Sequence, residues 1–141
     1  MNDENPSEST DSRPLALADS LGHVLIIDDD PGVRSVLKRS LEKAGFSCSE
    51  AENGNEGLKK LGGKTVDLVI LDMLMPEKEG AETLREIRAT WPVVPLFAIS
   101  GGGAISADDC LRIARALGAD KVFRKPFDLK DMVASVQSAL A

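Results

Sequence analysis

The sequence predicts an α/β fold: a doubly wound, five-stranded parallel sheet with helices on both faces. Five short apolar segments alternate along the chain with segments whose apolar residues recur at helical spacing. The apolar run at 66–71 contains no polar residue after Asp67, which is typical of a strand buried on both faces. Strands that alternate with helices in this way pair in parallel, with a right-handed crossover at each helix.

The first strand and helix occupy residues 23–45. The apolar run at 23–27 predicts a buried strand, and Asp30 and Pro31 suit the N-cap and the first position of a helix. Gly45 is typical of the left-handed residue that follows a helix end. The apolar face of this helix is formed by Val33, Val36, Leu37, Leu41 and Ala44.

The next two units centre on the strand that ends at Asp72. Residues 46–51 alternate apolar and polar, as expected of a strand at the edge of a sheet. We expect a helix at about 55–61 that stops at the glycine pair 62–63. Asp72 directly follows the third apolar run, and Pro76 cannot continue a sheet ladder, so the chain turns by that point.

The last two units complete the pattern. Pro92 ends a helix at 79–90, and Gly118 ends a helix at about 105–117. Asp128 is suited to cap the last helix, which packs its apolar face inward. The fourth strand, the turn that follows it and the fifth strand are expected at 93–99, 100–103 and 121–124.

Length and composition allow one folded domain at 22–141, preceded by a disordered acidic tail at 1–21. The chain has 141 residues, 43% hydrophobic and only 4% aromatic, enough for one aliphatic core. The tail is rich in Ser, Asp, Glu, Asn and Pro, a composition typical of disorder. No basic patch indicates nucleic-acid binding, and no apolar run is long enough for a membrane span. Cys48 and Cys110 match no metal-ligand spacing, and we interpret them as core residues of a cytoplasmic protein.

Polar side chains stand at the ends of four predicted strands: Asp28 and Asp29, Asp72, Ser100 and Lys125. The carboxyl ends of parallel strands meet at one edge of an open sheet, where ligands bind. Three crowded carboxylates need a cation, and Mg²⁺, which prefers oxygen ligands and keeps several waters, fits best. Together with an ammonium and a hydroxyl group, they predict a site that accepts a phosphoryl group on Asp72.

Four motifs at these strand ends resemble the receiver domain of bacterial two-component response regulators, a likeness that extends from about residue 24 to 140. They are Ile-Ile-Asp-Asp-Asp at 26–30, Leu-Asp-Met-Leu-Met-Pro at 71–76 with Gly80, Ala-Ile-Ser at 98–100 and Arg-Lys-Pro-Phe at 124–127. The resemblance implies the flavodoxin-like strand order 2-1-3-4-5. It also implies phosphoryl transfer to Asp72 from a sensor histidine kinase or a histidine phosphotransfer protein.

The resemblance further implies roles for individual residues. Lys125 and Ser100 would contact the phosphoryl group, and the Lys125–Pro126 peptide bond is expected to be cis. The metal ligands that it implies are Asp28, through a water molecule, Asp29, Asp72 and the backbone carbonyl of Leu74.

Two features depart from the family pattern and concern how a signal leaves the domain. Val122 stands where the family usually has an aromatic residue that reports phosphorylation, and three glycines follow Ser100. Because the chain ends at Ala141, directly after the last predicted helix, we expect a stand-alone receiver of the chemotaxis-regulator type. Its output would be a contact with a downstream protein or a phosphoryl relay, without nucleic acid or membrane. Ile113 is expected to be partly exposed for such a contact.

Two other functions remain open. A Mg²⁺-dependent phosphohydrolase would use the same aspartyl-phosphate intermediate, but the haloacid-dehalogenase type needs a second Asp two residues after the nucleophile, where this chain has Leu74. A non-phosphorylated interaction module would keep the fold without the chemistry, but no member of the acidic, Ser and Lys set is missing. His23, at the start of its strand, is interpreted as structural. We therefore expect a protein that catalyses only its own phosphorylation and dephosphorylation.

Overall fold

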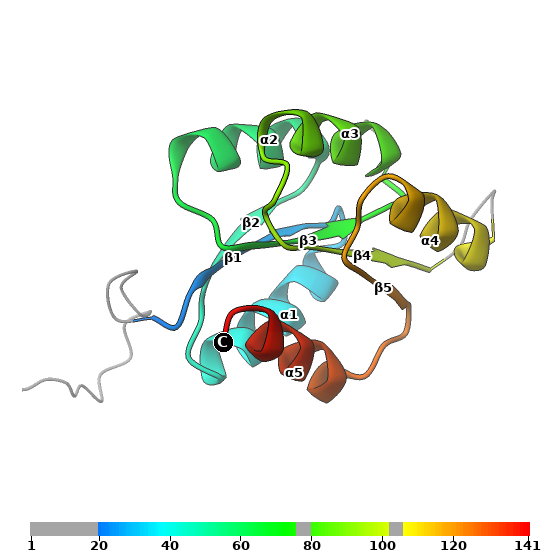
Figure 1. Ribbon diagram of the computed structural model, residues 1–141. Helices are drawn as coiled ribbons and strands as arrows, with labels where there is room; N and C mark the ends of the chain where they lie inside the picture. Colours follow the sequence, from blue (N-terminus) through cyan, green and yellow to red (C-terminus); the bar gives the residue numbers. More distant parts are fainter. Residues whose placement is uncertain (1–19, 76–79, 102–105) are drawn as a thin grey trace, which may run out of the picture.

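A five-stranded parallel sheet forms the middle layer of the fold, in the order β2-β1-β3-β4-β5 (Figure 1). The computed structural model describes residues 20–75, 80–101 and 106–141. Within these ranges the elements are β1 (His23–Ile27), α1 (Pro31–Lys43), β2 (Ser47–Ala51), α2 (Gly54–Gly63), β3 (Leu68–Asp72), α3 (Gly80–Thr90), β4 (Leu96–Ser100), α4 (Ala107–Ala116), β5 (Lys121–Arg124) and α5 (Leu129–Ala139). Every pair of neighbouring strands is parallel, so the predicted doubly wound order is confirmed.

Helices cover both faces of this sheet, with α1 and α5 on one face and α2, α3 and α4 on the other (Figure 1). Side chains of β1 alternate between the two layers: Val24 and Ile26 join the core under α1 and α5, whereas Leu25 and Ile27 join the core on the opposite face. β1, β3 and β4 are buried along their whole length. Their continuous apolar sequences follow from this burial on both faces.

Side-chain caps and one glycine set the helix ends that the sequence predicted. At the start of α1, Asp30 Oδ1 accepts the backbone N–H of Gly32 at 2.8 Å. At the start of α5, Asp128 Oδ1 accepts the backbone N–H of Lys130 at 2.7 Å. Gly45, just beyond α1, has a φ of 105°, the left-handed conformation that glycine adopts without strain. These three predictions are confirmed.

β2 begins one residue later than the sequence predicted, and β3 and β4 begin two and three residues later. β3 begins at Leu68, and the Asp67 carboxylate just before it accepts the backbone N–H of His23 at 2.7 Å. β4 begins at Leu96, directly after a proline that has no N–H for the ladder. Val93, expected inside that strand, is 89% exposed.

Two helix predictions also need correction. α2 continues through Gly63 and ends at Lys64, whose backbone is extended. Glycine weakens a helix without forbidding helical dihedrals, so the glycine pair forms the last turn instead of stopping it. Val36, predicted on the apolar face of α1, is 43% exposed, and that face depends on Leu37 and Leu41.

Some predictions concern residues that the structure does not describe. Residues 1–19, which make up most of the tail predicted at 1–21, lie outside the described residues. The domain boundary at 22 therefore stays a prediction. Residues 102–105, which include most of the turn after Ser100, also lie outside them. α4 begins at Ala107 with Ser106 as its N-cap. In the described part of the chain, no helix combines the length and the hydrophobicity needed to cross a membrane.

The start of α3 lies directly against the end of β3. The backbone N–H of Gly80 donates to the Met73 carbonyl at 3.1 Å. A Cβ atom at Gly80 would come within 2.4 Å of Met73 Cα and 2.8 Å of the Asp72 carbonyl oxygen. Because both are backbone atoms, they cannot move aside as a flexible side chain would. Glycine at position 80 therefore allows α3 to pack against the segment that carries Asp72.

Gly80→Ala should lower the free energy of unfolding by about 1–3 kcal/mol, the usual cost of overpacking. Gly62→Ala is the matched control, because a Cβ at Gly62 would meet nothing within 4 Å. This control should raise the free energy of unfolding by about 0.5–1 kcal/mol through helix propensity. Urea unfolding followed by circular dichroism measures both, and an unchanged midpoint for Gly80→Ala would contradict the packing argument.

Candidate functional site

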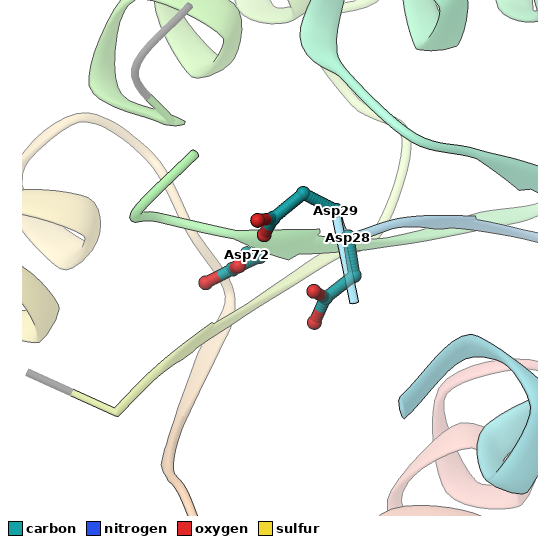
Figure 2. Close-up of side chains that lie close together, drawn as sticks. All are labelled: Asp28, Asp29 and Asp72. Carbon is teal, nitrogen blue, oxygen red and sulfur yellow. The ribbon is translucent and has the colours of Figure 1, made fainter. Parts of the chain in front are cut away.

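Three carboxylates gather at the carboxyl ends of two neighbouring strands (Figure 2). β1 and β3 pair with Ile27 opposite Leu71, so Asp28 and Asp72 come next to each other at the sheet edge. One carboxylate oxygen from each of Asp28, Asp29 and Asp72 lies within 4.8 Å of the other two. The structure thus brings together the acids that the sequence placed at this edge.

Two of these carboxylates are buried and the third is exposed. Asp28 is 0% and Asp72 is 2% exposed, whereas Asp29 lies on the solvent side. Asp28 Oδ1 accepts the backbone N–H of Asp30 at 2.9 Å, and Asp72 Oδ1 accepts that of Leu74 at 3.2 Å. Among the described residues, no hydrogen bond of good geometry reaches the buried Asp28 Oδ2.

Lys125 brings a positive charge to these acids from the end of β5. Its Nζ lies 3.0 Å from Asp28 Oδ2 and 3.6 Å from Asp72 Oδ2, close enough for ion pairs but poorly aligned for a hydrogen bond to Asp28. Burial alone would lower the pKa of Lys125, but its contacts with the two carboxylates together raise that pKa above its usual value. The Lys125–Pro126 peptide bond is cis, as the resemblance implied.

Ser100 ends β4 at the same edge and is fully buried. The register pairs Asp72 with Ile99, so Ser100 lies one residue further toward the carboxyl edge. Its carbonyl accepts the backbone N–H of Lys125 at 2.9 Å, which ties the ends of β4 and β5 together. All predicted site residues therefore lie at one edge of the sheet, and their chemical roles stay predictions.

The sequence analysis did not single out Arg34, which holds the backbone of this edge in place. Its Nη1 donates to the Asp28 carbonyl at 2.7 Å, and its Nε donates to Glu50 Oε1 at 3.0 Å. This side chain therefore connects α1 and β2 to the residue that begins the acidic cluster. An arginine in the first turn of a helix gives no local signal for such a contact, because the contact depends on how α1 crosses the sheet.

His23 lies at the opposite end of β1 from the acidic cluster. The ring is 4% exposed, with Nδ1 at 2.7 Å from Ser47 Oγ and Nε2 at 2.7 Å from Ser49 Oγ. Burial, together with the charge of Lys64, lowers the pKa of His23 below its usual value against the raising effect of Asp67. The imidazole is therefore a neutral, buried hydrogen-bonding group, as the structural interpretation expected.

The acidic cluster carries more negative charge than Lys125 compensates. Burial, and after it the charge of Asp28, raises the pKa of Asp72 to about 7, against the lowering effects of Lys125 and the Leu74 N–H. A hard divalent cation with oxygen ligands would supply the missing positive charge. The buried Asp28 oxygen without a hydrogen bond and the exposed Asp29 carboxylate suit such a cation, so the donor set fits Mg²⁺.

The sequence profile of the response regulator receiver domain matches residues 24–137. The chain belongs to this family. Receiver domains bind Mg²⁺ at an acidic pocket, and this chain has an acidic cluster formed by Asp28, Asp29 and Asp72. Membership also implies a kinase or another phosphodonor as a partner.

Curated relatives of the receiver are longer proteins. Over 120 residues it is 38% identical to the DNA-binding transcriptional regulator NtrC of Salmonella typhimurium, a match that covers 85% of this chain and 25% of NtrC. Over 118 residues it is 34% identical to the response regulator MprA of Mycolicibacterium vanbaalenii, covering 83% of this chain and 49% of MprA. The receiver thus spans a quarter to about half of the length of these relatives.

Solved structures share the fold. The crystal structure of a CheY-like response regulator receiver domain protein from Methanospirillum hungatei superposes with a TM-score of 0.78 at 26% identity. The match covers 86% of this chain and 94% of that chain. Almost the whole of that receiver therefore has the same arrangement of helices and sheet as this chain.

The raised pKa of Asp72 predicts that the metal-free receiver loses stability as the pH rises. The folded carboxyl group keeps its proton up to about pH 7, whereas the unfolded chain releases it near the ordinary value. The contribution of this group is therefore most favourable at low pH and is lost as the pH rises through 7. The Asp72→Asn side chain is uncharged at every pH. The free energy of unfolding of this variant should therefore exceed that of wild type by about 2 kcal/mol at pH 8, with a smaller difference at pH 5.

Urea unfolding at pH 5 and pH 8 in the presence of a chelator measures this difference. Asp131→Asn, which removes an exposed carboxylate from α5, serves as the control and should show no comparable gain at pH 8. Mg²⁺ at pH 8 should stabilise wild type more than Asp72→Asn. Equal stability of wild type and Asp72→Asn at pH 8 without metal would contradict the repulsion argument.

Proposed function

We propose that this receiver accepts a phosphoryl group on Asp72 from the phosphohistidine of a sensor histidine kinase or a histidine phosphotransfer protein. The observation that carries the proposal is the position of the Asp72 carboxylate, buried at the end of β3 with Lys125 Nζ 3.6 Å away and two further acids beside it. A carboxylate nucleophile, a cation and a fixed ammonium are what phosphoryl transfer requires.

The transfer forms a bond between an Asp72 carboxylate oxygen and phosphorus, while the bond from phosphorus to the donor imidazole nitrogen breaks. The imidazole leaves as the neutral ring after it takes up a proton from solvent. The Leu74 N–H orients the nucleophile by donating to Asp72 Oδ1. Lys125, which faces Oδ2 of Asp28 and Asp72, stabilises the negative charge of the phosphoryl oxygens without transferring a proton.

A bound Mg²⁺ supplies positive charge that offsets the three carboxylates and the phosphoryl oxygens. The side chains that would hold it are Asp29 and Asp72, with Asp28 acting through water, as the family resemblance implied. The backbone carbonyl of Leu74 would complete the protein ligands. Ser100, at the end of β4, would donate its hydroxyl to a phosphoryl oxygen.

The two alternative functions are less well supported. A phosphohydrolase of the haloacid-dehalogenase type needs an Asp two residues after the nucleophile as its acid and base, and this chain has Leu74 there. An interaction module without chemistry would not require Asp28, Asp72 and Lys125 to converge in a buried cluster whose charges repel. We therefore propose a protein that is not an enzyme toward other substrates and that catalyses only its own phosphorylation and dephosphorylation.

We propose that the output is an altered contact with a downstream protein in the cytoplasm. Ile113 on α4 is 42% exposed, as expected, and offers an apolar contact to a partner. Val122 is only partly buried in β5 and packs against the core under α4. Val122 is too small to lock either state as a buried aromatic ring would, so we assign the response to a shift of α4.

Phosphorylation of Asp72 is tested with acetyl phosphate and intact-mass measurement. Wild type should gain one phosphoryl group in the presence of Mg²⁺ and none with a chelator. Asp72→Asn should gain none, whereas the control Asp131→Asn should behave as wild type. Equal labelling of wild type and Asp72→Asn would overturn the assignment of the nucleophile.

Lys125→Ala should separate phosphorylation from its conformational consequence. Without the ammonium that bridges Asp28 and Asp72, the variant should fold and bind Mg²⁺ but lose most chemical-shift changes at 106–118 when beryllofluoride is added. Lys121→Ala, which removes an exposed lysine from the same strand, should keep them. The same shift changes in Lys125→Ala and wild type would show that the lysine does not transmit the signal.

A further inference from the structure

A second polar cavity lies between the edge strand β2 and helix α2. It has a volume of about 680 Å³ and is lined by Ser49 of β2 and by residues from both ends of α2. None of its lining residues belongs to the phosphorylation site. The cavity therefore needs an explanation of its own.

The walls of this cavity are positively charged on an acidic protein. Lys59, Lys60 and Lys64 line it against one acid, Glu56, while the chain as a whole has a net charge of −6. Within the described residues, none of the three lysines forms an ion pair with a carboxylate. Glu56 is held at the helix start, where its Oε1 accepts the backbone N–H of Glu52 at 2.7 Å.

Fixed hydrogen-bonding groups lie beside the lysines. The half-buried Ser49 hydroxyl is held by His23 Nε2 at 2.7 Å on one side and borders the cavity on the other. Asn53 Oδ1 accepts the N–H of Glu56 at 2.8 Å, which leaves its NH₂ group as a donor. Lys60 Nζ donates to the Glu50 carbonyl. The lining therefore combines mobile ammonium groups with polar groups whose positions are set by the fold.

Two glycines keep the end of α2 open. A Cβ at Gly62 or Gly63 would meet nothing within 4 Å, so packing requires neither glycine. Glycine costs a helix about 0.5–1 kcal/mol relative to alanine. Of the two, Gly63 borders the cavity and Gly62 does not. The missing side chain at 63 leaves the space beside Lys59 and Lys64 accessible.

We propose that this cavity binds the phosphate group of a small molecule. Lysine binds phosphate as a point charge, and the lining has no arginine to pair with a planar carboxylate through two hydrogen bonds. The lining also has no aromatic side chain on which a base or sugar ring could stack, so the phosphate itself supplies most of the interaction. The ligand is free phosphate or a phosphate monoester, and its site is independent of Asp72.

The single histidine of the sequence provides a direct readout, since its ring contacts Ser49. The full chain is titrated with inorganic phosphate, and separately with glycerol phosphate, at constant ionic strength and with a chelator. Saturable changes are expected in the His23 ring signals and in the amides of 49 and 53–64. Tighter binding of glycerol phosphate would favour a monoester as the ligand, tighter binding of inorganic phosphate would favour free phosphate, and equal binding would show that the phosphate group alone supplies the affinity.

Gly63→Glu and Gly62→Glu form a matched pair of variants, because both add one carboxylate to open space on α2. Gly63→Glu should weaken phosphate binding at least about tenfold, equal to ~1.4 kcal/mol. Gly62→Glu should change the affinity for phosphate less than about twofold. The circular dichroism spectra of the two variants should be the same. Equal weakening by both variants, changes that never saturate, or changes confined to residues around Asp72 would overturn the proposal. Binding to duplex DNA or anionic vesicles but not to either small phosphate would overturn it as well.

Discussion

The repulsion between Asp28 and Asp72 is the constraint on which the rest of the site depends. Both carboxylates are held out of water at the ends of paired strands, and burial together with the charge of Asp28 raises the pKa of Asp72. Lys125 offsets part of this charge from β5. The uncompensated negative charge suits a divalent cation with oxygen ligands, which fits the observation that receiver domains bind Mg²⁺ at an acidic pocket.

The scaffold holds these charges in place through burial on both sides of the sheet. β1, β3 and β4 have no exposed residues, and their apolar side chains feed two separate cores. Contacts that reach across elements then fix the strand ends: Arg34 on the Asp28 carbonyl, the Ser100 carbonyl on Lys125, and Gly80 against Met73. The rigid strands therefore fix the positions of the site residues, which are the last residues of β3 and β4 or follow the strand ends directly.

The sequence predicts most of this arrangement because its signals are local. Continuous apolar runs identify buried strands, Asp30 and Asp128 identify helix starts, and carboxylates that follow strands identify the acidic edge. The failures involve contacts between distant segments. The Asp67 side chain bonds the start of β1 just before β3 begins, and the exposure of Val36 depends on where α1 lies on the sheet. Hydrophobic periodicity predicts neither fact, because it shows which face of a helix or strand is apolar but not which residues of other elements that face contacts.

The hydrogen bond from Lys60 to the Glu50 carbonyl has a consequence for how copies of this chain meet in concentrated solution. β2 pairs only with β1 among the described strands, and Glu50 stands at an alternate position whose carbonyl points away from β1. Such an open edge is a template for another strand, which leads to aggregation. Because the Lys60 ammonium group occupies the Glu50 carbonyl, another strand cannot form a backbone hydrogen bond there. At the other edge, β5 is short and has the exposed Lys121 and Arg124 at its two ends, and both short length and charged residues discourage pairing with another strand.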